Sequence, residues 1–174
     1  FNIDGVNFKY KSHFELVNCV FDNNPYSGSS IVSFTNCNFS TLKILSDSLS
    51  SKQKISFDSD TIDRLLVKNI YCSVNNSKIK FLDINGANEK YDNTPWINSF
   101  RTYKIYNNVI NVLKISKVRT AQIKLNKLSS STISGPIGGL FIEENIIEAD
   151  LSHIIDIDQE TENTFHLINR AGIR

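Results

Sequence analysis

The chain has 174 residues, of which 40% are hydrophobic and 21% are charged, and its formal net charge at pH 7 is +1. These values predict a globular protein with a sizeable core, and they exclude a protein that binds polyanions through its overall charge alone. No apolar run approaches the roughly 18 residues of a membrane-spanning helix. The segment that begins at Phe1 has neither a basic leader nor an apolar signal core.

Short segments that alternate apolar and polar residues recur along the chain, each followed by a polar corner and then by another apolar residue. The clearest copy is Tyr103–Ile110, and the others are residues 1–8, 14–21, 32–39, 65–72 and 140–147. Alternation with a period of two is typical of a strand with one buried face. Asn or Gly at the corner accepts a left-handed backbone, so the chain can bend sharply there. Because one such unit cannot bury its apolar face alone, the repeat predicts parallel strands stacked as a solenoid.

Further strands and loops are predicted between these copies. A turn at residues 23–28 separates the second and third copies through its Pro and Gly. Strands are expected at residues 54–57, 78–84, 100–106, 109–115, 121–125, 154–157 and 165–168. Two segments with little periodicity, Asn85–Ser99 and Ser129–Gly139, are expected to be loops that leave the same side of the solenoid, and a long loop of this kind is often functional.

The alternation also predicts which side chains face inward. Phe34, Ile105 and Ile142 are expected to be buried, whereas Lys104 is expected at the surface. The three cysteines are Cys19, Cys37 and Cys72. They fall in repeat positions, which predicts buried thiols, and a disulfide between the first two is the alternative. The sequence contains no CxxC pair and no Cys/His cluster with zinc spacing.

Asparagine occupies four of the corners, at Asn18, Asn36, Asn69 and Asn107. With these corners, nearly the whole chain resembles a right-handed parallel β-helix of the pectate-lyase-like class. The resemblance implies an all-β fold with irregular rung lengths, long loops on one side and a ladder of these four side chains along one edge, with Gly5 and Glu144-Asn145 at its ends. A pentapeptide-repeat coil is the nearest rival, and it fails because the later intervals are long and uneven.

The solenoid is predicted to be a single domain over residues 1–174. Phe1 lies directly in the repeat frame and the sequence has no Met, so we expect this domain to be a piece of a longer chain. By resemblance to the β-helical shafts of phage tailspikes and the passenger regions of bacterial surface proteins, it is expected outside the cell, at a cell surface or on a virion. The partners implied are a polysaccharide or cell-surface glycan, adjoining domains of the same chain and, as one assembly, a homotrimer.

Pectate-lyase-like enzymes act on acidic polysaccharides with carboxylates that bind calcium and a basic residue that takes a proton from the sugar. The residues of suitable type near predicted strand ends are Asp58, Asp60, Asp63, Asp83, Arg101 and Lys124. Such a cluster is chemically feasible, because calcium takes several oxygen ligands and a general base must lie within hydrogen-bond reach of its substrate. Acidic residues at strand ends are more often solvated turn residues, which is the interpretation we favour.

Other chemistry has weaker support in the sequence. The Gly-His-Gly, Asp-Asp and Arg-x-Lys elements of the related polygalacturonase-type hydrolases are absent, and Asp156 and Asp158 have no partner motif that would make them a catalytic pair. The histidines are His13, His153 and His166. They are scattered without a nucleophile signature and are expected to be surface or packing residues. Basic residues form no stripe, which disfavours nucleic-acid binding.

The sequence therefore predicts a non-enzymatic structural or adhesive domain whose loops contact glycans, without a cofactor. A polysaccharide lyase or glycoside hydrolase is the alternative, and calcium is expected only if the protein is a lyase. The predicted ligand-binding residues are Tyr91, Asp92 and Trp96, because an aromatic ring can cover the apolar side of a sugar while a carboxylate takes its hydroxyls. The alternative for Trp96 is that it folds back as a lid on the core.

Overall fold

The computed structural model describes residues 2–5, 13–17, 30–47, 53–86, 102–118, 120–134, 139–147, 156–158 and 168–170 of the chain. These residues form sixteen strands and no helix. The strands are β1 (Asn2–Asp4), β2 (His13–Val17), β3 (Ser30–Thr35), β4 (Asn38–Leu45), β5 (Gln53–Asp58), β6 (Thr61–Lys68), β7 (Tyr71–Asn75), β8 (Lys78–Asn85), β9 (Tyr103–Tyr106), β10 (Val109–Ser116), β11 (Thr120–Lys124), β12 (Lys127–Ser134), β13 (Gly139–Glu143), β14 (Ile146–Ile147), β15 (Asp156–Asp158) and β16 (Ile168–Arg170). The part of the chain that the structure describes is therefore all-β, as predicted, and it has no helix that could cross a membrane.

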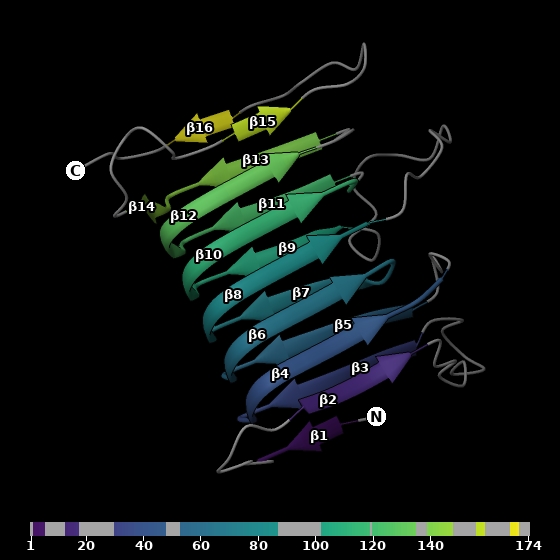
Figure 1. The fold of residues 1–174 in the computed structure, drawn as a ribbon. Helices are drawn as coiled ribbons and strands as arrows, with labels where there is room; N and C mark the ends of the chain where they lie inside the picture. The colour runs from purple at the N-terminus through teal and green to yellow at the C-terminus, as the bar shows by residue number, and fades with distance from the viewer. Residues whose placement is uncertain are drawn as a thin grey trace.

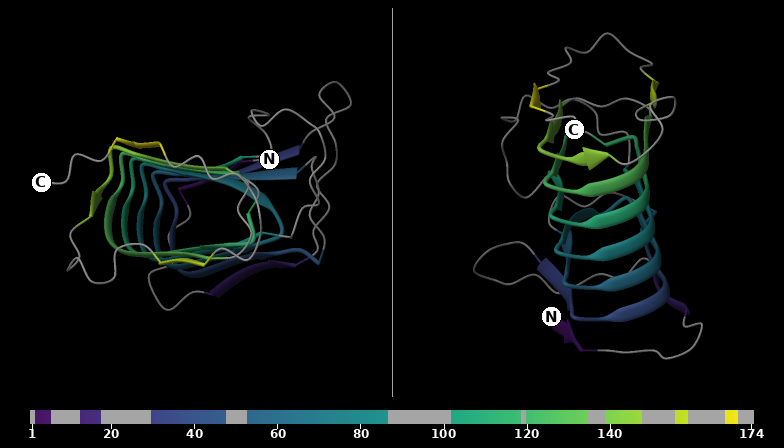
Figure 2. Two further views of the ribbon diagram at one scale, coloured as in Figure 1. Left: turned by 90° about the horizontal axis from the view of Figure 1, so that it is seen from above. Right: turned by 90° about the vertical axis from the view of Figure 1, so that its left-hand side faces the viewer.

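The strands form two parallel sheets between which the chain alternates. Sheet A has the order β1-β3-β5-β7-β9-β11-β13-β16, and sheet B the order β14-β12-β10-β8-β6-β4-β2, with β15 also pairing with β12. From β3 to β14, each odd-numbered strand and the even-numbered strand that follows it make one rung, and successive rungs stack on one another (Figure 1). Seen from above in Figure 2, the strands of each sheet overlie one another. This arrangement is consistent with a parallel β-helix.

The core lies between the two sheets and is built from columns of apolar side chains in register. In sheet A, the residue pairs Phe34–Phe57, Phe57–Val74 and Ile105–Ile123 are paired neighbours, and all are fully buried. The Phe34 and Phe57 rings stack with centroids 5.4 Å apart. Sheet B supplies two further columns, Leu42-Leu65-Leu82-Leu113 and Ile44-Val67-Ile84-Ile115-Ile133. Each rung thus buries the apolar face that it could not bury alone.

The predicted inward residues are confirmed. Phe34 and Ile105 are 0% exposed and Ile142 is 8% exposed, whereas Lys104 on β9 is half-buried. Among the cysteines, Cys37 and Cys72 are buried, as expected, and burial raises the pKa of the Cys72 thiol to about 12. Cys37 forms no disulfide, so the alternative of a disulfide to Cys19 is wrong, and Cys19 itself lies outside the described residues.

A corner of two residues joins each sheet A strand to the next sheet B strand from β3 to β14. The first residue of the corner has a left-handed backbone in every rung: Asn36, Ser59, Asn76, Asn107, Leu125 and Glu144, with Gly5 continuing the column after β1. The backbone N–H of each of these residues except Glu144 donates to a carbonyl of the next rung, at 2.9–3.2 Å. This two-residue corner therefore adds hydrogen bonds to the stack and does not interrupt it.

The predicted asparagine ladder is partly wrong. Asn36 and Asn107 do lie in the column of two-residue corners, together with Gly5 and Glu144 at its ends, but Asn18 lies outside the described residues. Asn69 follows a sheet B strand and lies at the opposite corner, where its Nδ2 donates to the Ser46 carbonyl at 2.8 Å. The copy at residues 65–72 was therefore placed in the wrong frame, because a strand end followed by Asn and an apolar residue occurs at both corners.

The opposite corner joins each sheet B strand to the next sheet A strand and varies in length. Its stacked residues include Ser46, Asn69, Gly86 and Lys117, linked by backbone hydrogen bonds of 2.8–3.2 Å. The strands that precede residues 87–101 and 135–138, β8 and β12, both pair with β10 and end in register at this edge. The two predicted loops themselves lie largely outside the described residues, so their common side stays a prediction. The second is shorter than expected, since residues 129–134 belong to β12.

Candidate functional site

The second residue of each two-residue corner points into the core and carries a polar or sulfur group. The column consists of Cys37, Asp60, Ser77, Asn108, Asn126 and Asn145, all buried. The backbone N–H of each residue donates to the side chain of the next, at 2.7, 3.1, 2.8, 3.0 and 2.9 Å in order. We call this column the inner ladder. It lies one residue after the corner asparagines that the sequence suggested. Those asparagines contribute a shorter outer contact, in which Asn107 Nδ2 donates to Asn76 Oδ1 at 2.8 Å.

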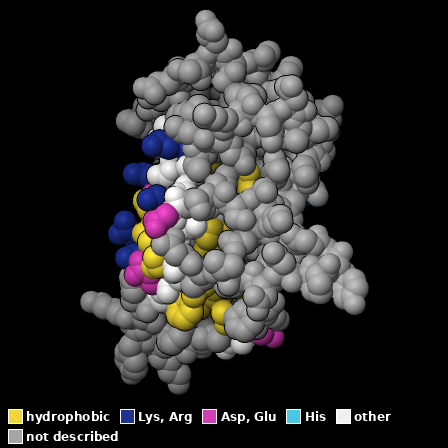
Figure 3. All heavy atoms as spheres, turned by 90° about the vertical axis from the view of Figure 1, so that its right-hand side faces the viewer, with side chains coloured by type: hydrophobic (Ala, Val, Ile, Leu, Met, Phe, Trp, Pro, Cys, Tyr) yellow, Lys and Arg dark blue, Asp and Glu magenta, His cyan; other side chains and the backbone are white. Residues whose placement is uncertain are grey.

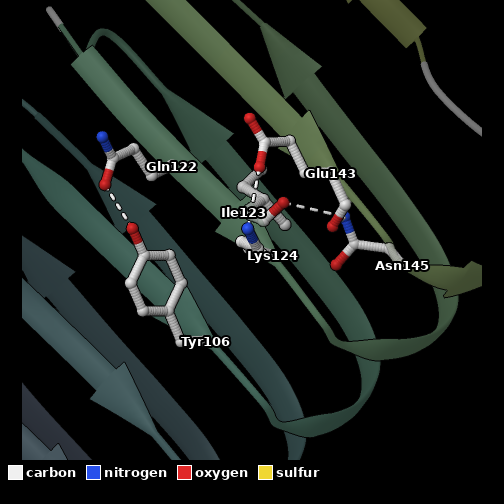
Figure 4. Close-up of polar contacts among 6 residues, drawn as sticks. All are labelled: Tyr106, Gln122, Ile123, Lys124, Glu143 and Asn145. Carbon is white, nitrogen blue, oxygen red and sulfur yellow. Dashed lines mark hydrogen bonds and ion pairs between the residues drawn. The ribbon is translucent and has the colours of Figure 1, made fainter. Parts of the chain in front are cut away.

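The asparagines of the inner ladder also bind the preceding rung. The Nδ2 groups of Asn108, Asn126 and Asn145 donate to the carbonyls of Val74, Ile105 and Ile123, at 2.9, 2.7 and 2.8 Å. Figure 4 shows the last of these contacts. Each such side chain therefore satisfies both a donor and an acceptor inside the core, where an unpaired polar group would be costly.

Asp60 is the exception in the inner ladder, because an ionised carboxylate has no proton to donate, whereas the Ser77 hydroxyl and the asparagine amides do donate. Its Oδ1 accepts from the Cys37 N–H at 2.7 Å, but its buried Oδ2 has no hydrogen-bond partner. Burial raises the pKa of Asp60 to about 6, against the opposing effect of the Cys37 hydrogen bond. A proton on Oδ2 would supply the missing donor, so the neutral acid fits this position better than the anion does.

The outward face of sheet B carries a cluster around Phe81 on β8. Phe81 pairs with Arg64 on β6 and with Val112 on β10, so it lies in a column that runs along the stack. The Arg64 Cζ lies 5.2 Å and the Lys114 Nζ 5.6 Å from the centroid of the half-buried ring. Both cations are solvent-exposed. A cation over an aromatic ring is attracted by the ring's negative face, so Phe81 holds two neighbouring positive charges in defined places.

Asp83, two residues further along β8, is the acidic member of this cluster. It is half-buried and pairs with Lys114 across the sheet. Burial raises the pKa of its carboxyl, and the charges of Lys114 and Arg64 act in the opposite direction. Within the described residues, neither Arg64 nor Lys114 has a carboxylate oxygen within 4.0 Å. The cations of the cluster are therefore near a carboxylate without being paired to it.

The outward face of sheet A has a different character. The hydroxyl group of Tyr106 donates to Gln122 Oε1, and Lys124 Nζ forms an ion pair with Glu143 Oε2 at 3.0 Å (Figure 4). The hydrogen bond to Glu143 is the main reason why the pKa of Lys124 is raised. Lys124 is therefore held in its protonated form by the ion pair with Glu143, whereas a general base must be deprotonated to accept a proton.

The structure does not bring the predicted calcium and base residues together. Asp60 is in the core, Asp63 pairs with Lys80 at 2.8 Å on sheet B, and Asp58 accepts from Asn76 at 2.8 Å beside the two-residue corner. Asp83 lies in the Phe81 cluster, and Arg101 is outside the described residues. Among the described residues no group of three or more His, Cys, Asp or Glu side chains could hold a metal ion. The carboxylates of the predicted cluster are separated by the sheets and the core.

The remaining predicted residues cannot be placed in a site. Tyr91, Asp92 and Trp96 lie outside the described residues, as do His153 and His166. Asp156 and Asp158 belong to β15 and His13 to β2, but only their backbones are described. The predicted loop site therefore stays a prediction.

Lys54 on β5 was not singled out from the sequence. It is half-buried, and its pKa is lowered first by burial and then by the charge of Lys104. No residue beside it in the sequence signals this environment, because Lys104 comes from a strand two positions away in sheet A. Comparison of the chain with protein-family models, with curated proteins and with solved structures found no match.

Proposed function

We propose that the chain is a right-handed parallel β-helix of pectate-lyase-like architecture that serves as a structural, adhesive domain and contacts glycans, as in phage tailspikes or bacterial surface proteins. The observation that carries this proposal is the register of the two sheets, which continues from β3 to β13 in sheet A and from β4 to β12 in sheet B. Parallel crossovers are almost always right-handed. Regular stacking of this kind gives a stiff rod with long, flat outer faces, which suits display and adhesion.

The location that goes with this proposal is outside the cell, at a cell surface or on a virion. Residues 87–101, between β8 and β9, contain Tyr91, Asp92 and Trp96 and are proposed to contact a sugar. The test is a glycan array with the wild-type chain and Trp96→Ala, together with thermal melting of both. We expect loss of glycan binding with a nearly unchanged melting temperature. A large fall in melting temperature would show instead that Trp96 covers the core.

A polysaccharide lyase is the second candidate, and one observation favours it: the lowered pKa of Lys54, which is the property required of a base. The discriminating experiment is incubation with acidic and neutral polysaccharides, with and without calcium. New reducing ends or the absorbance of an unsaturated sugar, both lost in Lys54→Met, would establish the enzyme. Glycan binding without either product supports the adhesive domain.

A further inference from the structure

Asn85 and Gly86 form the only Asn-Gly pair in the sequence, and they lie where a central strand of sheet B ends. Asn85 is the last residue of β8, which lies between β6 and β10 (Figure 1). Gly86 is the buried first residue of the opposite corner. The pair matters chemically, because an asparagine followed by glycine loses its side-chain amide more readily than an asparagine followed by any larger residue.

The reaction is an intramolecular imide formation followed by hydrolysis. The backbone nitrogen of Gly86 attacks the side-chain carbonyl carbon of Asn85, and the side-chain nitrogen leaves as ammonia, which closes a succinimide ring. Water then opens the ring to aspartate or, more often, to isoaspartate, in which the backbone runs through the former side chain. Water is the only co-reactant. Glycine favours the first step because it has no Cβ to hinder the approach of its nitrogen.

The stacking of the rungs requires glycine at this position. A Cβ on residue 86 would lie 2.4 Å from the Lys117 carbonyl oxygen and 3.1 Å from Val118 Cγ1. The first of these distances is too short for any side chain, and the contact atom belongs to the backbone of the next rung. Close packing of the opposite corner therefore selects the residue that makes Asn85 reactive.

Two backbone hydrogen bonds oppose the reaction in the folded protein. The Asn85 carbonyl accepts from the Asn69 N–H at 2.9 Å, and the Gly86 N–H donates to the Ser116 carbonyl at 2.8 Å. Asn85 also pairs with Lys68 on β6 and with Ser116 on β10, which holds it extended. Ring closure needs the attacking nitrogen aligned with the side-chain carbon, and this requires rotation about the bond from the Asn85 Cα to its carbonyl carbon. That rotation breaks both hydrogen bonds.

We propose that Asn85 is a deamidation site that the folded stack keeps closed and that opening of the end of β8 releases. This inference goes beyond glycan contact and does not depend on it. The rate in the native protein is the rate in the unfolded chain multiplied by the fraction of molecules in which this end is open. Since opening costs at least the two backbone hydrogen bonds, deamidation of the folded chain should be at least about thirtyfold slower.

The two products differ in their effect on the rung. Aspartate at position 85 keeps the backbone unchanged and places a negative charge opposite Lys68, which is exposed. It joins a sheet B face that already carries charged side chains, seen along the left margin of Figure 3. Isoaspartate adds a carbon to the backbone between β8 and Gly86, so Gly86 can no longer fit against the Lys117 carbonyl. Aspartate is therefore tolerated, whereas isoaspartate loosens the corner.

The experiment measures deamidation at residue 85 of the whole chain at pH 8, folded in buffer and unfolded in urea, by peptide mapping with mass spectrometry. In urea, Asn85 is expected to react faster than every other asparagine, and Gly86→Ala to slow it several-fold. In buffer the wild-type rate at Asn85 is expected to fall at least about thirtyfold. Isoaspartate-containing protein, refolded from urea, should melt below wild type, and Asn85→Asp should melt close to it.

Two matched variants test whether opening is local. Ile115 and Ile44 are equally buried in one column of sheet B, but Ile115 pairs with Ile84 on β8, whereas Ile44 lies on β4, two strands away. Ile115→Ala is expected to accelerate deamidation of the folded chain at least about tenfold, and Ile44→Ala much less. Melting curves establish that both variants are folded.

Equal rates in buffer and in urea would overturn the protection of Asn85 by the fold. A faster reaction at another asparagine in urea would overturn the assignment of the site. Equal acceleration by Ile115→Ala and Ile44→Ala would overturn local opening at the end of β8. None of these results bears on glycan binding, so the proposed function is tested separately.

Discussion

Replacing Asp60 by Asn should stabilise the protein and remove part of its pH dependence. In the native state the pKa of Asp60 is raised by burial from 3.8 to about 6. Between these two pH values the native protein holds a proton that the unfolded chain has released, so stability falls as the pH rises through this window. The contribution of Asp60 to the free energy of unfolding is highest below about pH 4, and it falls to a constant lower value above about pH 6. A shift of about two pKa units corresponds to about 3 kcal/mol.

Asparagine at this position would also complete the inner ladder. The Nδ2 groups of Asn108 and Asn126 each donate to the carbonyl of the residue that pairs with the position three residues before them. For residue 60 that position is Phe57, which pairs with Phe34, so the new Nδ2 should reach the Phe34 carbonyl. That hydrogen bond adds about 1 kcal/mol. Above pH 7, Asp60→Asn should therefore raise the free energy of unfolding by about 2 to 4 kcal/mol, and below pH 4 the two proteins should differ little.

The assay is urea denaturation followed by circular dichroism at several pH values between 4 and 8, compared as the difference between variant and wild type. Asn108→Asp is the matched variant in the opposite direction, because it creates a second carboxylate at an equivalent ladder position. It should lose stability above pH 6 and recover part of it on acidification. An Asp60→Asn variant with the same pH dependence as wild type, or with lower stability at pH 8, would refute the reasoning.

Three further predictions follow from packing. Gly86→Ala should destabilise the protein by about 1 to 3 kcal/mol or misfold the rung, because a Cβ there would lie 2.4 Å from the Lys117 carbonyl oxygen; an unchanged denaturation midpoint would contradict this. Ile105→Ala should cost about 2 to 5 kcal/mol and Lys104→Ala much less, so equal melting temperatures would show that the inward assignment is wrong. Cys72 should resist alkylation at pH 8 until the chain unfolds, because its thiol is fully buried with a pKa of about 12, and rapid labelling of the folded protein would count against the core position.

The strands could be predicted from the sequence because most of their apolar residues alternate with polar ones. Burial largely follows this alternation in sheet A, whereas each eight-residue strand of sheet B has two successive outward residues between its first and second buried positions. The corners were harder to predict from the sequence. Asn36 and Asn107 have residue types that favour a left-handed backbone, but Ser59 and Leu125 take the same conformation with no such signal. Tertiary stacking fixes the backbone there. The rungs that contain Ser59 and Leu125 were therefore missed as copies of the repeat.

The candidate sites could be predicted only in part. The inner ladder is hard to recognise because its members range from Cys37 to Asn145 in chemistry and recur at uneven intervals of 17 to 31 residues. The cluster around Phe81 requires the register of sheet B, in which Asp63 and Arg64 are both exposed although they are adjacent in sequence. A simple alternation would have placed one of them inside. The position of Arg64 over the Phe81 ring follows from that local irregularity and from pairing across strands, neither of which the sequence displays.

The contrast between the two corners determines where this protein can vary in length. At the two-residue corner every rung is tied to the next through the inner ladder, so an inserted residue would break two neighbouring repeats at once. At the opposite corner the connection ranges from two residues after β6 to the long segment after β8. Insertions, deletions and grafted epitopes should therefore be tolerated at that edge alone. Removing residues 108–125 would delete one complete repeat and bring Asn126 into the place of Asn108, which makes the rod adjustable in steps of a single rung.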